Sequence, residues 1–544
     1  MSGSLRFDLR TAVAATFAVV ALALPVAGAF RQPGAPMEEG KLLIAAELVL
    51  EGKVPHEDFE HFYGPADVWA VAAAFAVGGR SVDVERAVGV VYFALLVGSV
   101  FALGRRLGRV PAALAAAAAG WIMVPFGVHA YSWTAGLALL LLAVALALSA
   151  IDRPANLHLA AGAGAAAGLA LLFRADLVLA VGLVLAVVWT RLTPAQRLRG
   201  LVGGVATAAV PYLVHLAMAG FDDMWRGMIT DSLFRLRDGR ALPMPPPARD
   251  LTAWLDLSAP EPTPSPILPD HARVLQLRLF FWMTVFAIVA TVAFAVWAWV
   301  RRRASRDATW LACIAAIGVG TASQMLQRAD ATHVRFVACV VLPLAPLAFA
   351  AVVHLLDAKF PRSATATEAL VLSMVALLLA VPFYAGRLAG TTVGRAVGRV
   401  QTATVGIDGR SFPVIDPLAP DATALLGRME TVDRGGGKLF VGPQDLRLAN
   451  YSDSFLYFLL GERFRPVSFF LESNPGIANA DDSHLADDIA RADVLILSKE
   501  YDNWDEPNTS RRPGPEAPVR VVAERFCVLA ELGRYQILLP AGRC

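Results

Sequence analysis

The chain has 544 residues, of which 56% are hydrophobic and 17% are charged, with a formal net charge of +2. Soluble domains average about 45–50% apolar and about 25% charged residues. The composition therefore excludes an ordinary soluble protein and indicates a mainly α-helical, polytopic membrane protein with the lipid bilayer as a partner. No basic, aromatic-rich stretch occurs in the sequence, so nucleic acid is not expected as a partner.

Apolar segments long enough to cross a bilayer recur along most of the chain. A membrane-spanning helix needs about 20 apolar residues. By this measure about eleven spans are predicted, near residues 11–30, 83–104, 109–128, 131–150, 157–173, 176–190, 201–219, 275–299, 307–326, 334–356 and 367–386. The first segment resembles a signal peptide, but the many spans after it favour an uncleaved helix. The shorter segment 64–78 is expected to lie at the membrane surface or to dip into it.

The basic residues predict how these spans are oriented. Cytoplasmic turns of membrane proteins are enriched in Lys and Arg. With the N-terminus inside, every inner turn is basic: 104–109, 152–154, 190–200, 301–306 and 357–362. We therefore expect a multi-pass cell-membrane protein with a cytoplasmic N-terminus. Residues 1–386 would form the membrane domain, and residues 387–544 a small extracytoplasmic α/β domain.

This C-terminal part has the patterns of a soluble domain. "KLFVGP" (438–443) and "ADVLILS" (492–498) are typical of short buried strands, with a helix at "SHLADDIARA" (483–492) between them. The segment 525–540 is predicted to form a hairpin that turns at "ELG". A Cys527–Cys544 disulfide is compatible with the outer compartment, and two unpaired thiols are the alternative.

Two external loops are predicted within the membrane domain. Loop 220–273 contains proline-dense stretches that disfavour regular structure. Loop 31–82 is acidic, and the spacing of its apolar residues predicts an amphipathic helix over about 37–51, ended by Gly52 and lying in the membrane interface. Glu38 and Glu39 begin this helix, and Asp58 follows it.

Arg174, Arg328 and His333 lie in very short turns on the same outer face. Arg can hold a phosphate in bidentate fashion, and a carboxylate can act as a general base toward a hydroxyl. A phosphate leaving a sugar while a hydroxyl attacks would need both groups. Structural roles are the alternatives: Glu38 and Glu39 can favour a helix N-terminus, Asp58 can cap a turn, and the cationic turns can be ordinary helix ends.

The first external loop resembles that of GT-C glycosyltransferases, in the bacterial branch related to protein O-mannosyltransferases and lipid A aminoarabinose transferases. The resemblance rests on the acidic pair Glu38–Glu39, on "VPHEDF" (54–59) and on "YGP" (63–65), and it covers roughly residues 1–200. The family usually has Asp-Glu as the pair and Tyr at the position of His56. The resemblance aligns Glu38 with the catalytic Asp, and the longer Glu leaves open whether Glu38 or Glu39 is the base.

The resemblance implies an inverting transfer of a sugar from a polyprenyl-phosphate donor to a hydroxyl of a cell-envelope acceptor. Glu38, Glu39 and Asp58 would be the catalytic candidates. Arg174, Arg328 and His333, chosen from the topology, would bind the donor phosphate. No cofactor is required, although the acidic loop is compatible with a divalent metal. The sugar, the acceptor and the oligomeric state stay open.

Two other classes of function are compatible with the composition. A transporter or flippase of an envelope precursor would place ionisable residues deep in its spans, often beside broken helices, and the apolar segments contain few. A non-catalytic membrane anchor for the external domain would tolerate changes at all three loop carboxylates.

Overall fold

The structure is a computed structural model that describes residues 22–245, 270–302, 305–356, 362–380, 391–432, 436–500 and 506–544. The chain divides into two compact units, and neither is continuous in sequence. Unit 1 contains residues 1–30, 89–212 and 243–400, and unit 2 contains residues 31–88, 213–242 and 401–544. The predicted domain boundary between residues 386 and 387 lies outside the described residues and stays a prediction.

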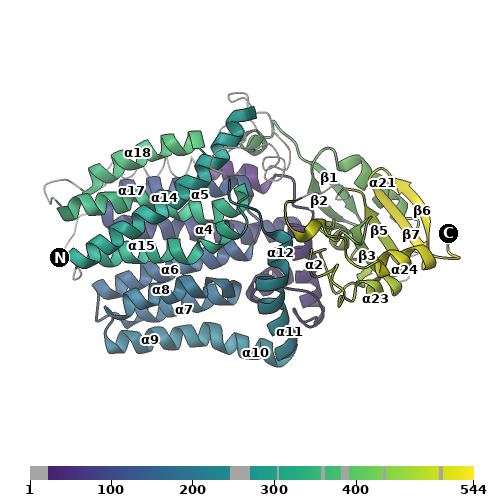
Figure 1. The fold of residues 1–544 in the computed structure, drawn as a ribbon, viewed down its shortest axis with the longest axis horizontal. Coiled ribbons are helices and arrows are strands. Elements are labelled where there is room, and N and C mark those ends of the chain that lie inside the picture. The colour runs from purple at the N-terminus through teal and green to yellow at the C-terminus, as the bar shows by residue number, and fades with distance from the viewer. Residues whose placement is uncertain are drawn as a thin grey trace. The chain divides into compact units, whose positions relative to one another are not determined.

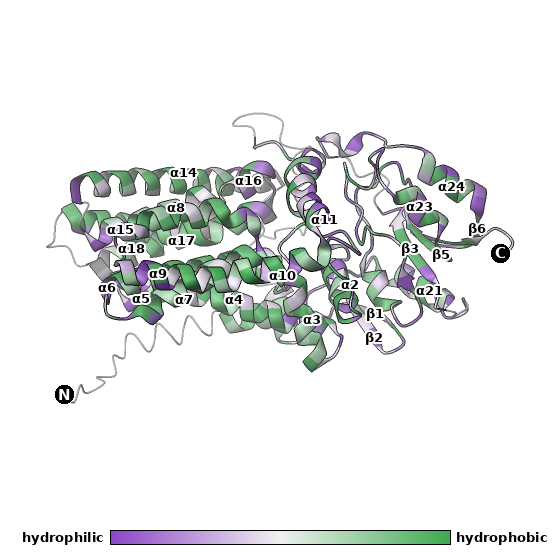
Figure 2. Ribbon diagram, turned by 90° about the horizontal axis from the view of Figure 1, so that it is seen from below, coloured by the Kyte–Doolittle hydropathy of each residue, from purple (hydrophilic) through white to green (hydrophobic). Residues whose placement is uncertain are grey.

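Unit 1 is a bundle of apolar helices, which run side by side in Figure 1 and are coloured largely as hydrophobic in Figure 2. Two helices are shared with unit 2, namely α4 (Val82–Gly104), which begins there, and α10 (Val210–Ala219), which ends there. The longer remaining helices are α5 (Arg109–Met123), α6 (Ser132–Asp152), α7 (Leu157–Phe173), α8 (Val178–Trp189), α9 (Pro194–Gly204), α14 (Asp270–Arg302), α15 (Arg306–Thr321), α17 (Ala331–Leu356) and α18 (Arg362–Ala380). The short elements are η1 (Arg105–Leu107), η2 (Val124–Phe126), η3 (Ala175–Leu177), η4 (Val205–Ala209), α16 (Ser323–Gln327) and α20 (Val393–Ala396).

Small residues allow close helix contacts in this unit. A Cβ on Gly164 of α7 would lie 1.8 Å from the carbonyl oxygen of Gly200 in α9. A Cβ on Gly203 would lie 2.3 Å from the carbonyl oxygen of Ala161. Helix pairs in membranes associate through van der Waals packing of such small residues, because lipid gives apolar side chains no drive to associate. The Gly- and Ala-rich sequence of α7 therefore determines how closely α9 approaches.

Seven helices of the described residues are long and apolar enough to cross a membrane, by length and composition. They are Val82–Leu107, Arg109–Phe126, Ser132–Asp152, Pro194–Ala219, Arg278–Arg302, Arg306–Gln327 and Ala331–Leu356. Ala66–Gly78, Leu157–Phe173 and Ala175–Trp189 are shorter apolar helices. The polytopic, mainly helical fold class is confirmed. The count of eleven spans and the orientation of the termini stay predictions, and residues 11–21 of the first predicted span lie outside the described residues.

Unit 2 contains a five-stranded sheet of order β4-β3-β5-β7-β6, in which β3 pairs in parallel with β4 and β5, and the other pairs are antiparallel. A separate hairpin joins β1 and β2. The strands are β1 (Ala403–Ile407), β2 (Arg410–Val414), β3 (Lys438–Pro443), β4 (Arg465–Pro466), β5 (Val494–Ser498), β6 (Phe526–Leu532) and β7 (Tyr535–Pro540). The helical elements are α2 (Glu38–Leu50), α3 (Ala66–Gly78), α11 (Phe221–Trp225), η5 (Arg226–Arg235), α12 (Leu236–Arg240), α21 (Ala419–Met429), α22 (Phe455–Leu459), α23 (Leu485–Ala490), η7 (Thr509–Arg511) and α24 (Ala517–Arg525).

The predictions for the C-terminal part are confirmed. β3 and β5 are the two expected buried strands, α23 lies between them in sequence, and β6 and β7 form the expected hairpin. Parallel strands covered on both faces consist of continuous apolar residues, which is why these short runs were recognisable. The Cys527–Cys544 disulfide is present, so the alternative of two unpaired thiols is wrong.

Two predictions for the external loops need correction. The predicted helix over 37–51 exists as α2, but it is buried around most of its surface and is not amphipathic. Its backbone touches α22 so closely that a Cβ on Gly40 would lie 2.2 Å from the backbone nitrogen of Phe455. In loop 220–273, residues 221–240 are helical, because the proline-dense stretches begin only after them. Residues 246–269 of that loop lie outside the described residues.

Candidate functional site

The acidic pair of the first external loop opens α2. Both Glu38 and Glu39 lie in the first turn, where the backbone N–H groups and the helix macrodipole favour negative charge. The two side chains nevertheless have different environments. Glu38 is exposed, whereas Glu39 is 0% exposed.

Arg86 of α4 occupies both oxygens of Glu39. Its Nε lies 2.8 Å from Oε1 of Glu39, and its second guanidinium nitrogen donates to Oε2 at 3.1 Å. Arg86 is 2% exposed and also donates to the backbone oxygen of Gln32. A bidentate, desolvated pair of this kind fixes both groups in place. Glu39 is therefore poorly placed to take a proton from an acceptor hydroxyl, and Glu38 is the accessible member of the pair.

Asp58 closes a turn in the motif "VPHEDF". Its carboxylate accepts a hydrogen bond from the backbone nitrogen of Val54 at 2.8 Å and pairs with the Lys53 ammonium at 2.9 Å. The Asp58 side chain keeps 30% of its surface exposed. The capping role considered from the sequence is thus present, and the carboxylate also stays accessible to solvent.

Buried histidines surround this motif inside unit 2. Nδ1 of His56 lies 2.8 Å from Nε2 of His215, and His61 lies 3.0 Å from a carboxylate oxygen of Asp67. Burial, together with the neighbouring His61 and His215, lowers the pKa of His56 to about 2. His56, which stands where the family usually has Tyr, is therefore a neutral, buried group.

Arg174 of unit 1 is held by a carboxylate and an aromatic ring. Its guanidinium donates to both oxygens of Asp176, at 2.9 and 2.7 Å, and lies 5.0 Å from the ring centroid of Trp133. The amide of Gln324 donates to the same Asp176 at 2.7 Å. Arg174 and Asp176 thus form an ion pair at this helix end, which holds Arg174 in a fixed orientation.

Arg328 and His333 share a second carboxylate, Asp330. Arg328 Nε lies 2.7 Å from Asp330, and His333 contacts Asp330 through its backbone nitrogen at 2.8 Å and through Nδ1 at 2.9 Å. Burial alone would raise the pKa of Asp330, but the nearby charges of His333 and Arg328 outweigh it and hold that pKa below its ordinary value. An ionised Asp330 accepts the Nδ1 proton of His333 and leaves Nε2 as the outer ring nitrogen.

Unit 1 brings these predicted cations together. Gln324, which binds Asp176 beside Arg174, belongs to α16, and α16 ends directly before Arg328. Phe336 completes the link, because its ring lies 5.7 Å from that of His333 and its carbonyl accepts a hydrogen bond from the Trp133 indole. The two cationic turns therefore form one cluster. The three predicted carboxylates all belong to unit 2.

Sequence reasoning missed several charged partners. Arg86 follows Glu85 at the start of a predicted span, and this charge pair in an apolar helix was the available signal. Lys41 pairs with Glu472 at 2.6 Å, and the Arg410 guanidinium lies 2.8 Å from Glu47. The partners of Lys41 and Glu47 lie 431 and 363 residues away in sequence, so no local pattern connects them.

Comparisons with known proteins identify the fold. No protein-family model and no curated protein matches the sequence. The structure of ArnT from Cupriavidus metallidurans bound to undecaprenyl phosphate is similar, with a TM-score of 0.54 and 15% identity over 97% of this chain and 98% of ArnT. Apo ArnT matches over the same shares of the two chains, with a TM-score of 0.49 and 14% identity. An oligosaccharyltransferase from Archaeoglobus fulgidus in complex with Zn and sulfate has a TM-score of 0.45 and 13% identity, over 90% of this chain and 68% of its own.

The likeness to ArnT bound to undecaprenyl phosphate is one of fold. The likeness extends over nearly the whole of both chains, well beyond the roughly 200 residues covered by the sequence motifs. The chain therefore shares the fold of ArnT over nearly its whole length.

Proposed function

We propose that this protein is a glycosyltransferase that moves a sugar from a polyprenyl-phosphate donor to a hydroxyl of a cell-envelope acceptor, on the outer face of the membrane. The observation that carries the proposal is the cluster of Arg174, Arg328 and His333 in unit 1. The full-length likeness to ArnT bound to undecaprenyl phosphate supports a donor of the same lipid class. Multi-pass insertion in the cell membrane would give the protein access to such a lipid.

The cluster suits a leaving phosphate monoester. Charge that develops on a phosphate oxygen is stabilised best by donors that are already oriented before the reaction. Asp176 and Asp330 orient the cations in this way, since each fixes a guanidinium through charge-assisted hydrogen bonds. His333, fixed through Nδ1, would donate a hydrogen bond from Nε2 to the same phosphate once the ring carries its second proton. We assign Arg174, Arg328 and His333 to donor phosphate binding.

Glu38 is the general base in this proposal. Its carboxylate takes the proton from the acceptor hydroxyl, the acceptor oxygen forms a bond to C1 of the sugar, and the bond from C1 to the phosphate oxygen breaks. Polyprenyl phosphate leaves with the electron pair, and the configuration at C1 inverts. Glu39 holds the start of α2 through Arg86, and Asp58 keeps the adjacent turn in place while remaining accessible.

No step of the proposed reaction is assigned to a cofactor or a divalent metal. Two oriented guanidinium groups and the ring of His333 would supply the hydrogen-bond donors for a monophosphate. The requirement for a metal can be measured directly with a chelator.

The proposal is tested by transfer of a labelled sugar from polyprenyl-phosphate donors in membranes that contain the protein. Wild type should yield a labelled envelope product, and Glu38→Gln should lower its rate by roughly 10²–10⁴-fold, the usual contribution of a general base. Glu57→Gln is the matched control, because Glu57 is an exposed carboxylate of the same loop. Equal expression of all variants is verified. Full transfer by both Glu38→Gln and Glu38→Gln/Glu39→Gln would refute the mechanism and favour a structural role for the loop carboxylates.

A further inference from the structure

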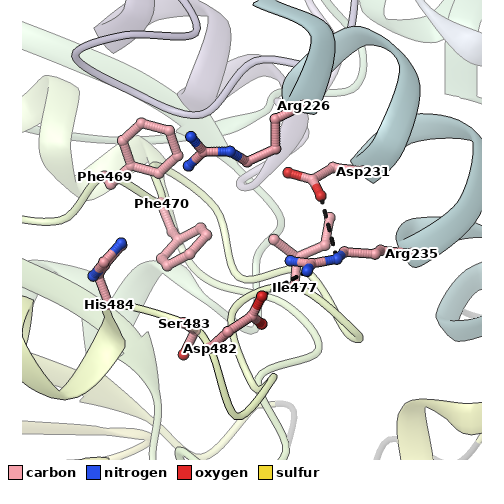
Figure 3. Close-up of a pocket in the computed structure, with 9 residues that line it drawn as sticks. All are labelled: Arg226, Asp231, Arg235, Phe469, Phe470, Ile477, Asp482, Ser483 and His484. Carbon is pink, nitrogen blue, oxygen red and sulfur yellow. Dashed lines mark hydrogen bonds and ion pairs between the residues drawn. The ribbon is translucent and has the colours of Figure 1, made fainter. Parts of the chain in front are cut away.

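Unit 2 contains a pocket of about 250 Å³ that the proposed reaction does not use (Figure 3). One wall is the helical segment η5, which contributes Arg226, Asp231 and Arg235. The opposite wall comes from the C-terminal segment and includes Phe469, Phe470 and His484. Pockets for drug-sized ligands usually measure about 300–1,000 Å³, so this volume suits a ligand of a single ring.

The π-helical geometry of η5 places its three charged residues on the pocket. An α-helix advances about 100° per residue, so Asp231 and Arg235 would lie about 140° and about 180° away from Arg226. A π-helix closes i→i+5 hydrogen bonds and has about 4.4 residues per turn, which reduces these angles to roughly 50° and roughly 20°. π-Helices are rare, and most are single-turn bulges inside α-helices, which are frequent at functional sites. The backbone conformation, and not an α-helical sequence pattern, therefore creates this charged face.

Asp231 has unused hydrogen-bonding capacity in the pocket. It is 4% exposed, and among the described residues its Oδ1 accepts no hydrogen bond. Nε of Arg235 lies 3.7 Å from that oxygen, which is too far for a hydrogen bond. Burial raises the pKa of Asp231, although Arg235 and Arg226 act in the opposite direction. A buried carboxylate oxygen without a donor is costly, so a ligand O–H that reaches Oδ1 would be bound favourably.

The charges of the pocket do not favour an anion. Arg226 already pairs with Asp223 at 2.5 Å, and Arg235 pairs with Asp482 at 2.6 Å. A phosphate would have to compete with these carboxylates and would also lie near Asp231. A hydroxyl group both donates and accepts, so a polyol can give hydrogen bonds to Asp231 and accept them from the arginines without displacing either ion pair.

Two aromatic rings complete the pocket. Phe469 and Phe470 lie with their ring centroids 5.6 Å apart and their planes at 88°, so they present differently oriented apolar surfaces. A sugar ring combines an apolar C–H face with hydroxyl groups around its edge, which is the combination that these rings and the charged face of η5 would accommodate. The backbone nitrogen of Glu60 donates to the carbonyl oxygen of Phe469 at 2.8 Å, which ties this wall to the acidic loop.

We propose that this pocket binds one uncharged sugar ring of a glycan acceptor, with Asp231 accepting a hydrogen bond from a ring hydroxyl and Phe470 packing against the C–H face. The role as acceptor site rests on the proposed function. The binding of a sugar ring rests only on the pocket.

The test measures binding of neutral methyl glycosides of mannose, glucose, galactose and arabinose to the purified full-length protein. Saturation-transfer NMR is suited to weak ligands, and the detergent must carry no sugar headgroup. At least one glycoside should bind, and Asp231→Asn should weaken its binding about tenfold or more because a hydrogen bond to a charged group is lost. Asp238→Asn is the matched control, because Asp238 is an exposed carboxylate of the adjoining α12. Ser483→Phe, which fills the pocket from its opposite wall, should abolish binding without altering the charged residues.

Three results would overturn the proposal: no glycoside binds, binding is equal in wild type and both pocket variants, or inorganic phosphate binds in place of the sugar and is lost in the same variants. Thermal unfolding curves verify that Asp231→Asn and Ser483→Phe are folded. The assay uses no donor and no transfer step, so sugar binding can be observed even if the proposed function fails. If transfer occurs but Asp231→Asn leaves the acceptor KM unchanged, the role of the pocket in acceptor binding is refuted.

Discussion

Replacing Glu39 tests whether its carboxylate has a structural or a catalytic role. In Glu39→Gln, the side chain keeps its size but loses the charge that neutralises Arg86. Arg86 is 2% exposed and would remain as a buried cation that has lost its bidentate carboxylate partner. We therefore expect the main effect of Glu39→Gln to be on the stability of unit 2, and any loss of transfer to follow from misfolding.

The magnitude follows from the burial of the pair. Removal of one partner of a buried ion pair costs about 3–5 kcal/mol, because the other charge stays desolvated without its direct partner. Unit 2 contains about 230 residues, and for domains of this size each kcal/mol lowers Tm by about 2–4 °C. The expected decrease in Tm is therefore about 6–20 °C. Replacement of both partners, in Glu39→Gln/Arg86→Met, should recover most of it.

The assay combines thermal unfolding of the purified protein with sugar transfer measured well below the lower Tm. The four proteins of the cycle are wild type, Glu39→Gln, Arg86→Met and Glu39→Gln/Arg86→Met, which together give the coupling energy of the pair. If Glu39 is structural, the double variant regains transfer along with stability. Glu38→Gln should behave in the opposite way, with a Tm close to that of wild type and a large loss of transfer.

The reasoning would be refuted by a Glu39→Gln variant that keeps the wild-type Tm but loses transfer, with no recovery in the double variant. That result would identify Glu39 as the base in spite of its pairing with Arg86. It would also mean that the Arg86 contact opens during the reaction.

Other consequences of the structure can be measured separately. Arg174→Lys keeps the charge but loses the bidentate geometry, so the donor KM should rise about tenfold in steady-state transfer assays; an unchanged KM would remove Arg174 from the phosphate site. Transfer should persist in excess EDTA, and a loss that Mg²⁺ or Mn²⁺ restores would contradict the metal-free mechanism. The lowered pKa of His56, about 2 against about 6.5 when unfolded, favours the neutral form in the folded state. The contribution of neutral His56 to the free energy of unfolding is thus complete above pH 6.5 and decreases as the pH falls, by about 2 kcal/mol at pH 5. The Tm of His56→Gln should therefore depend less on pH between 5 and 6.5 than the Tm of wild type. An equal pH dependence of the two Tm values would argue against a buried neutral His56. Cys527→Ser removes the disulfide to Cys544, which closes a loop of 17 residues, and should lower the free energy of unfolding by about 3 kcal/mol. Its Tm should be lower than that of the Cys313→Ser control.

Much of the fold could be predicted because its determinants are local. The predicted span at 131–150 corresponds to α6 and the span at 334–356 to α17, since length and hydrophobicity suffice to specify a membrane helix. β3 and β5 were recognisable for the same reason, as short continuous apolar runs. The Cys527–Cys544 disulfide was one of two open alternatives in the sequence, and the structure decides between them.

The environment of α2 could not be predicted from local patterns. Glu39, Lys41 and Glu47 are charged residues of a helix that was expected to lie in the membrane interface, yet each is paired with a charge from another segment. The partner of Lys41 is Glu472. Desolvation alone would lower the pKa of Lys41, but the charge and the hydrogen bond of Glu472, together with other nearby charges, outweigh it and raise that pKa above its ordinary value. A periodicity argument treats every charged residue as solvated. It therefore fails where the fold supplies counter-charges across long sequence separations, which is the case for Glu39 of the candidate site.

The pocket of unit 2 was missed for a different physical reason. Arg226, Asp231 and Arg235 are spaced by five and four residues, which an α-helical period distributes over separate faces. Only the π-helical backbone aligns them, and its i→i+5 bonding depends on the packing of the segment, not on the propensities of its residues. A helix whose charged residues recur near every 4.4 positions is therefore ambiguous in sequence. It is a solvated surface helix if the backbone is α-helical, and one wall of a polar site if the backbone widens. In this chain the structure shows the widened, π-helical backbone, so the segment forms one wall of a polar pocket. The binding test of Asp231 is therefore informative whatever the outcome of the transfer assays.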